Sequence, residues 1–205
     1  MVKPYGDKLK SKKGLREYIK RLPPNKIVLF LVNAKKYAKI NMDILKIIIS
    51  EKKFSGIYIA ASRPYTTLIK DLKSNEISVN DIFFIDCVTK MVPTPQGVRV
   101  LYKEKLTTKN CLYITSPANL TELGVLLSQA FTIIKNYNKK FLFLDSLSTL
   151  LIYNDVATIA KFVHFLTTRL RLFGLVGIIM SMEREIDKKL LLTLSELCDY
   201  VVEVV

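Results

Sequence analysis

Short runs of consecutive apolar residues alternate along the chain with longer segments in which apolar residues recur every three or four positions. The short runs are typical of strands buried on both faces, and the longer segments are typical of helices that bury one face. Together they predict an α/β fold: a three-layer sandwich in which helices cover both faces of a mostly parallel central sheet. The expected strands are 27–32, 57–61, 82–85, 111–115, 141–144, 175–180 and 200–204.

The helical segments between these strands have recognisable start and stop signals. We expect Asn41 to cap a helix that follows a loop at 33–40, and Pro64 to lie at the start of the next helix. Residues 92–108 interrupt the alternation, and 98–103 within them predict a small additional strand. The expected helices are 15–22, 41–52, 64–73, 119–137, 156–173 and 185–197, with a short helix at 147–152.

The formal net charge of +14 is unevenly placed along the chain. Residues 1–26 hold nine lysines and arginines against Asp7 and Glu17, a local net charge of +7. Such a block is typical of an arm that contacts nucleic acid or acidic lipid; the alternative is a solvated tail from a lysine-rich proteome. We divide the chain into a basic N-terminal arm with a short helix, 1–25, and an α/β domain, 26–205. The candidate nucleic-acid contacts are Lys8, Lys10, Lys12, Lys13 and Arg16.

The composition also excludes several classes of protein. The longest apolar stretch, 172–180, is too short to span a bilayer, and no apolar segment of a secretory signal follows the N-terminal charges. The three cysteines lie far apart and form no C-x-x-C pair, which is typical of a reduced protein. We expect a cytoplasmic protein with no membrane partner. The single histidine, His164, is expected on a helix surface, so neither a metal site nor a catalytic triad is predicted.

The apolar run 141–144 ends abruptly in Asp145, where a nucleotide-hydrolysing α/β protein would hold magnesium. The loop after the first apolar run, 33–41, contains no glycine, and no serine or threonine that could hold magnesium, so a tight grip on a triphosphate is not expected. Anion binding near the start of the next helix is the remaining nucleotide-related prediction. Its candidate residues are Asn33, Lys35, Lys36, Lys39, Asp145 and Ser146.

Each of these residues also has a structural interpretation. The lysines are then solvated loop residues, and Asp145 caps the helix that follows it. Asp86, which ends another apolar run, is interpreted as a turn or cap residue. For Asp145 we favour the capping interpretation, because the loop that would cradle a phosphate is missing.

Several segments resemble a known family. The segments 141–151 (FLFLDSLSTLL), 162–164 (FVH) and 169–174 (RLRLFG) resemble the Walker B strand and following helix of KaiC-like proteins in the RecA ATPase superfamily. That group's second and third strand regions are similar to 62–65 (SRPY) and 82–88 (IFFIDCV), and 115–124 (TSPANLTELG) is similar to the segment that opens the helix before Walker B. The resemblance covers most of residues 26–205 and implies a RecA/KaiC-like fold.

The departures from that family decide what the resemblance implies for function. Active members carry a P-loop at the position of 33–41 and an acidic catalytic base after the second strand, where this chain has Ala60-Ala61-Ser62-Arg63. The resemblance is therefore to KaiC-like proteins, common in archaea, that keep the ATPase fold without a P-loop. It implies a pseudo-ATPase domain with no catalytic residues, no cofactor and weak or absent nucleotide binding.

The predicted function is accordingly that of a regulatory or protein-interaction module. Rings and filaments in the family imply a protein partner or a homo-oligomer. Phe162, Phe165 and Leu172 are candidate partner contacts, unless another part of the domain covers them. The alternatives are a nucleic-acid-binding protein that uses the basic arm, and a weak nucleotide binder with a non-standard phosphate site.

Overall fold

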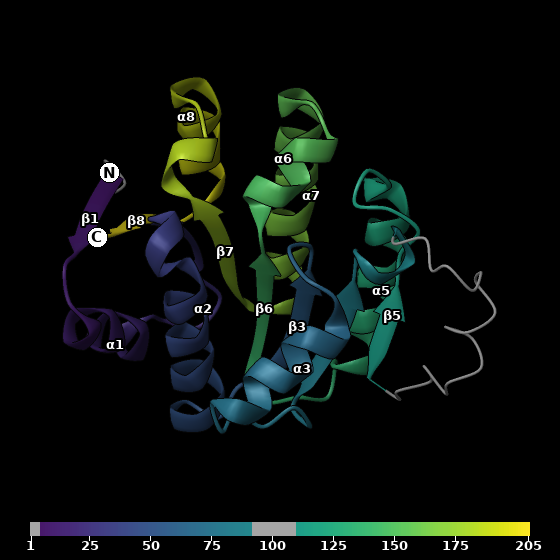
Figure 1. Cartoon of the computed structure of the whole chain (residues 1–205), viewed down its shortest axis with the longest axis horizontal. Coiled ribbons are helices and arrows are strands. Elements are labelled where there is room, and N and C mark those ends of the chain that lie inside the picture. Colours follow the sequence, from purple (N-terminus) through teal and green to yellow (C-terminus); the bar gives the residue numbers. More distant parts are fainter. Residues whose placement is uncertain (1–4, 92–109) are drawn as a thin grey trace.

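The computed structural model, which describes residues 5–91 and 110–205, contains one eight-stranded sheet. The strand order is β1-β8-β2-β7-β6-β3-β4-β5, and all seven pairings are parallel. The α/β prediction is therefore confirmed (Figure 1). The strands are β1 (Tyr5–Leu9), β2 (Ile27–Val32), β3 (Ser55–Ala60), β4 (Ile82–Asp86), β5 (Cys111–Tyr113), β6 (Lys140–Asp145), β7 (Val176–Met182) and β8 (Tyr200–Val204).

Helices cover both faces of this sheet. One layer consists of α1 (Lys12–Arg21), η1 (Ala34–Lys36), α2 (Tyr37–Lys46), the π-helix η2 (Ile47–Glu51) and α3 (Tyr65–Ser74). The other consists of α5 (Leu120–Ile133), α6 (Leu147–Tyr153), α7 (Val156–Phe173) and α8 (Lys188–Leu197). Short 3-10 turns, η3 (Thr89–Met91) and η4 (Glu183–Glu185), follow β4 and β7.

The two layers enclose two separate cores, because successive residues of a strand point to opposite faces of the sheet. In β6, for example, Phe141 and Phe143 pack with α1, α2 and α3, whereas Leu142 and Leu144 pack with α5, α7 and α8. β2 is buried along its whole length, as expected of a central parallel strand. Alternation places Asp145 on the same face as Phe143, beneath α2 and α3.

The start of α2 differs from the prediction. We expected a loop at 33–40 and a cap at Asn41, but η1 and α2 together begin at Ala34, and the side chain of Asn33 provides the cap by accepting from the Lys35 amide at 3.0 Å. Asn41 lies inside α2 and is fully buried. The loop is shorter than expected because Asn33 offers a cap directly after β2, eight residues before Asn41.

The structure of the segment before β2 also differs from the prediction. No strand was predicted before residue 27, yet β1 pairs with β8 at one edge of the sheet. The helix expected at 15–22 is α1, whose Leu15 and Ile19 are fully buried against the core. The basic segment is therefore folded onto the sheet over residues 5–21. The small strand predicted at 98–103 lies outside the described residues.

The apolar residues of α7 that were candidate partner contacts are largely buried. Phe162 is buried, and Phe165 is partly buried against the same core, so the alternative that the domain itself covers them is correct for these two residues. Only Leu172 is free of cover, with 71% of its surface exposed. His164 lies on the exposed side of α7, as predicted. Within the described residues, no helix combines the length and the apolar character needed to cross a bilayer.

Candidate functional site

The strand order reverses between β3 and β6, and the candidate site lies at the carboxyl end of these two strands. From β3 the chain continues to β4 on one side, and from β6 to β7 on the other. Ligands of open α/β sheets bind beyond the strand ends at such a point. Here Asp145 lies opposite Ala60 in the β3–β6 register, and Ala60 lies opposite Asp86 in the β3–β4 register.

Asp145 is fully buried, and its carboxylate is surrounded by hydrogen-bond donors. The Tyr37 hydroxyl donates to Oδ1 at 2.7 Å, and the Tyr58 hydroxyl donates to Oδ2. The Arg63 guanidinium also approaches Oδ2, at 3.5 Å. Both carboxylate oxygens are therefore engaged by side chains of this chain itself. Asp145 does not cap the next helix: the cap of α6 is Ser146, whose hydroxyl accepts from the Thr149 amide at 3.2 Å.

The two tyrosines are held in their protonated, donating form. Burial, and then the neighbouring Asp145 carboxylate, raise the pKa of the Tyr58 hydroxyl well above its ordinary value of 10. The same two causes, in the same order, raise the pKa of Tyr37. Ionising either hydroxyl would place a second negative charge beside Asp145 in a medium of low dielectric constant. Both hydroxyls consequently act as donors at neutral pH.

Arg63 connects this buried network to the surface. Its Nη1 donates to Asp71 Oδ2 at 2.8 Å, while Nη2 faces Asp145. Arg63 follows β3, and Asp71 lies on α3, so the ion pair fixes the β3–α3 loop against the site. The loop backbone is fixed in the same place, because the amides of Ala61 and Ser62 donate to the Asp145 carbonyl at 2.6 and 3.1 Å.

The lysines of the predicted anion site do not converge on Asp145. Lys35 and Lys36 lie in η1 and Lys39 lies in α2, and all three side chains are exposed. The residue of this segment that reaches Asp145 is Tyr37. Asn33 is used as a cap, and the other five candidate residues form two groups: a buried pair at the strand tip and three cations in the solvent.

Neighbouring polar residues of the strand ends have structural roles. Asp86 accepts from the amides of Tyr65, Val88 and Thr89 at 2.7 to 2.8 Å, which confirms it as a turn and cap residue. Ser148 is buried, and its hydroxyl pairs with that of Ser181 at 2.7 Å. No group of three or more metal-ligating side chains occurs among the residues that the structure describes.

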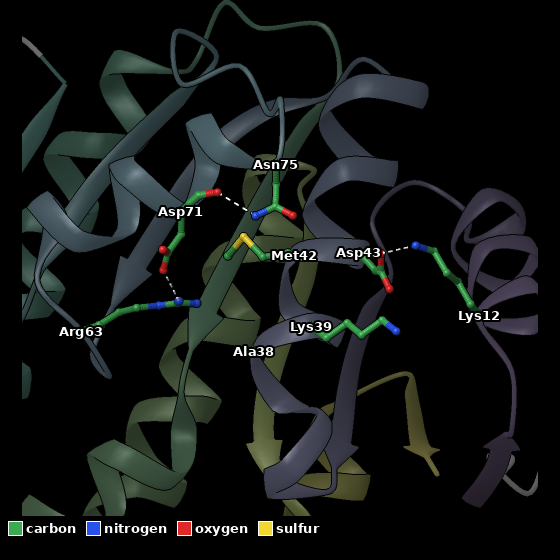
Figure 2. A pocket seen from close by; sticks show the side chains of 8 residues that line it. All are labelled: Lys12, Ala38, Lys39, Met42, Asp43, Arg63, Asp71 and Asn75. Atoms are coloured by element: carbon green, nitrogen blue, oxygen red, sulfur yellow. Dashed lines mark hydrogen bonds and ion pairs between the residues drawn. The ribbon is translucent and has the colours of Figure 1, made fainter.

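A groove of about 460 Å³ crosses the outer surface of α2, beside this network. Figure 2 shows that Arg63 and Asp71 form one side of the groove, whereas Lys12, paired with Asp43, forms the other. Met42 and Ala38 of α2 lie between the two sides. The lining residues are Lys12, Ala38, Lys39, Met42, Asp43, Arg63, Asp71 and Asn75.

Most of the candidate nucleic-acid contacts are paired with carboxylates of the domain. Lys8 pairs with Glu203 at 2.8 Å, Lys12 with Asp43 at 2.7 Å, and Arg16 with Glu51 at 3.0 Å. Lys10 and Lys13 are exposed and form no ion pair with the described part of the chain. These cations lie on β1, α1 and the turn between them, and so have fixed positions on the folded domain.

Sequence reasoning located Asp145 but missed the three residues that surround it. Tyr37, Tyr58 and Arg63 come from separate segments, and their partner Asp145 lies 108, 87 and 82 residues further along the chain. One signal was present: Tyr58 is a polar-tipped residue inside a run of apolar ones, and a buried tyrosine hydroxyl requires a partner. An aspartate at the end of another buried strand is a suitable acceptor.

Two solved structures share this fold. A KaiC-like protein, PH0186, from the hyperthermophilic archaeon Pyrococcus horikoshii OT3 aligns over 78% of this chain with 12% identity and a TM-score of 0.54. The chain spans 62% of the length of that protein. The flagellar accessory protein FlaH from Methanocaldococcus jannaschii aligns over 94% of this chain and 77% of its own, with 12% identity and a TM-score of 0.58. Identities this low show the fold alone.

Comparison at the level of sequence gives a family. No curated protein matches the chain. The model of a family described as a family of unknown function, DUF7504, matches residues 87–204, which is more than half of the chain. The matched segment includes β6 with Asp145 and the whole layer formed by α5, α6, α7 and α8. The chain belongs to the family DUF7504 and has a RecA/KaiC-like fold.

Proposed function

We propose that this chain is a non-catalytic RecA/KaiC-like domain, a pseudo-ATPase that acts as a regulatory or protein-interaction module. The observation that carries the proposal is the environment of Asp145. A magnesium ion needs exposed oxygen ligands, but both oxygens of this buried carboxylate already accept hydrogen bonds from Tyr37 and Tyr58. The residues present therefore do not fit a magnesium–nucleotide complex at the strand tip.

The segment after β2 supports the same proposal. A phosphate cradle needs several backbone amides that point at the ligand. Here the Lys35 amide donates to the Asn33 side chain at 3.0 Å, and the Lys36 amide donates to the Asn33 carbonyl at 2.9 Å. These amides stabilise η1, and the Tyr37 hydroxyl donates to the Asp145 carboxylate.

The segment after β3 lacks a group that could activate water. Its side chains are those of Ala61, Ser62 and Arg63, none of which is a carboxylate. Arg63 pairs with Asp71 and faces Asp145, so the position that is a base in active relatives holds a cation here. General-base catalysis at this position would require a proton acceptor of suitable pKa.

A protein partner fits the layer that contains α5, α6, α7 and α8. These helices expose large apolar side chains, which mark interaction surfaces when they cluster. Two neighbouring groups stand out: Ile152 and Tyr153 end α6, and Val156 begins α7. The exposed large apolar residues of this layer are Val125, Ile133, Ile152, Tyr153, Val156, Leu172 and Leu192. The partner is either a second copy of the chain or a different protein.

Isothermal titration with magnesium-ATP tests the proposal directly. We expect no binding tighter than about 1 mM, which corresponds to roughly 4 kcal/mol. Micromolar binding accompanied by turnover, lost in Asp145→Ala and retained in the control Glu185→Ala, would contradict it. Glu185 is an exposed carboxylate in η4, so its loss changes the charge without touching the strand tip.

Assembly is tested separately by light scattering on the eluting protein. A homo-oligomer that depends on the apolar layer dissociates when Ile152 and Val156 are replaced by serine. The matched control replaces Val205, an exposed apolar residue outside this layer, by serine. A monomer at all concentrations excludes the second copy and leaves a different protein as the partner.

A weak nucleotide binder with a non-standard phosphate site is the second candidate. The observation in its favour is that Lys35, Lys36 and Lys39 are exposed near the start of α2. Lys35→Gln and Lys39→Gln should then weaken any millimolar binding of ATP, and they should weaken pyrophosphate binding to the same extent. A nucleotide affinity that both variants leave unchanged removes this candidate.

A further inference from the structure

The positive charge of the domain is concentrated in one of its two helical layers. The elements α1, η1, α2, η2 and α3 contain eleven basic and four acidic residues, a net charge of +7. The basic residues are Lys12, Lys13, Arg16, Lys20, Arg21, Lys35, Lys36, Lys39, Lys46, Lys70 and Lys73; the acidic ones are Glu17, Asp43, Glu51 and Asp71.

The opposite layer does not share this excess. The helices α5, α6, α7 and α8 hold more residues in total, but they contain five basic and two acidic residues, a net charge of +3. The aspartate caps make the contrast larger, because Asp155 and Asp187 cap α7 and α8. The excess positive charge of the helices therefore lies on the α1–α2–α3 side.

Many cations of the basic layer are free to bind an anion. Ion pairs hold Lys12 to Asp43, Arg16 and Lys20 to Glu51, and Lys46 to Glu76. The other basic residues of the layer are exposed and form no ion pair with any described residue; they are Lys13, Arg21, Lys35, Lys36, Lys39, Lys70 and Lys73. They are distributed over all three helices rather than gathered at one point.

The surface of this layer is hollowed across α2, and Lys39 is the one of these unpaired cations that lines the hollow. The groove of about 460 Å³ crosses α2, with Lys12 of α1 on one side and α3 residues on the other, and Lys39 lies within it (Figure 2). Packed helices have axes 8–10 Å apart, so α1 and α3 flank a surface of roughly 20 Å. In Figure 1 α2 and α3 lie in front of the sheet, and α1 continues the layer beyond α2.

The lack of exposed apolar side chains on α1, α2 and α3 indicates which kind of polyanion this layer can bind. The helices α1, α2 and α3, which are described in full, expose no large apolar residue; in the described part of the chain, those that are exposed lie on α5 to α8 and at Val205 and Tyr137. A membrane-binding face needs apolar residues to insert, and single-stranded nucleic acid is held by exposed aromatic rings. A duplex backbone needs only cations at suitable spacing.

We infer that the α1–α2–α3 layer is a binding surface for double-stranded nucleic acid. The duplex lies across α2, and its phosphates contact unpaired lysines from each helix, including Lys13 of α1, Lys39 of α2 at the groove and Lys70 of α3. Contacts of this kind position a duplex without reading its bases. Binding is therefore independent of sequence. The site lies on a helical face, and the unpaired Lys10, in the turn before α1, borders it.

Fluorescence anisotropy with a labelled 20-base-pair DNA duplex of mixed sequence tests this inference on the full chain. The variant K13Q/K39Q/K70Q removes one lysine from each helix of the basic layer. The control K161Q/K188Q/K189Q removes three exposed lysines from the opposite layer and changes the net charge by the same amount. At about 100 mM salt we expect the first variant to lose at least tenfold in affinity and the control less than threefold.

The salt dependence gives a second readout. Loss of up to three phosphate contacts should lower the slope of log affinity against log salt by up to about 2.7, whereas the control keeps the wild-type slope. Equal losses in the two triple variants would overturn the inference, since the effect would then follow total charge. It would equally be overturned if anionic phosphatidylglycerol vesicles, polyglutamate or a single-stranded 20-mer bound as tightly as the duplex. Circular dichroism confirms that both variants are folded.

Discussion

Tyr58→Phe isolates the buried hydrogen bond on which the pseudo-ATPase proposal depends. The substitution removes one hydroxyl and keeps the ring that stacks on Phe143 at a centroid distance of 5.1 Å, so packing is nearly unchanged. Tyr58 is fully buried and its hydroxyl donates to Asp145, so no water can easily replace the lost donor. Asn41 Oδ1, at 3.4 Å, contributes only a long secondary contact.

The expected cost follows from the type of bond. A hydrogen bond to a charged group contributes about 1.5–3 kcal/mol to stability. For a chain of this length the melting temperature should fall by roughly 3–12 °C. Urea unfolding followed by circular dichroism, with a slope of roughly 2–3 kcal/mol/M, should show a midpoint lower by about 0.5–1.5 M. The matched control is Tyr153→Phe at a site 41% exposed, where we expect a change within about 0.5 kcal/mol.

A double-mutant cycle with Asp145→Asn completes the test. If the two side chains act on each other, the cost of Tyr58→Phe should shrink by at least about 0.5 kcal/mol in the Asp145→Asn background. Asp145→Asn alone should also destabilise, because Arg63 then loses a buried partner. A carboxylate kept for metal binding behaves differently, since replacing it by a neutral residue commonly leaves the stability of the protein unchanged or raises it. A Tyr58→Phe protein as stable as the Tyr153→Phe control would refute the reasoning.

Three further predictions concern pH, thiols and glycines. Because the pKa of Tyr58 is raised, its hydroxyl contributes fully to stability below pH 10, and this contribution is lost as the pH rises above 10. Urea unfolding at increasing pH should therefore show a smaller fall in the free energy of unfolding for Tyr58→Phe than for the wild type. The three cysteines are buried, and burial raises the pKa of Cys111 to about 12, so a thiol reagent such as DTNB should label none in the native protein and three in guanidinium. Gly56→Ala would place a Cβ 2.0 Å from the Phe141 carbonyl oxygen and should unfold the protein or cost more than about 3 kcal/mol, whereas Gly124→Ala, with its nearest neighbour at 3.6 Å inside α5, should stabilise by about 0.5–1 kcal/mol in thermal unfolding.

Three elements of the fold could be predicted from the sequence to the residue. β2, β8 and α7 begin and end where their apolar patterns do, because each is bounded by polar or helix-breaking residues and buried by neighbours on both sides. β1 could not be predicted, since an edge strand is paired on one side only and its sequence, YGDKL, has no apolar run. A strand that is stabilised by pairing with its neighbour need not have a recognisable apolar pattern in its own sequence.

The candidate site was predictable only in part, for a related reason. Asp145 stands out because a carboxylate ends an apolar run. Its interpretation depends on Tyr37 and Tyr58, which meet it only after the sheet is assembled. Without those contacts, a cap and a metal ligand looked alike in sequence, and the structure shows that Asp145 is a buried acceptor and not the cap.

The position of β2 in the sheet has a consequence for how the chain must be made. Both ladder partners of β2, the strands β7 and β8, lie within residues 176–204. At synthesis rates of about 5–20 residues per second, β2 waits roughly 7–30 s after it is made before a partner emerges. During that time its six consecutive apolar residues are unpaired on both edges. Products that stop before residue 176 should therefore aggregate through Ile27–Val32.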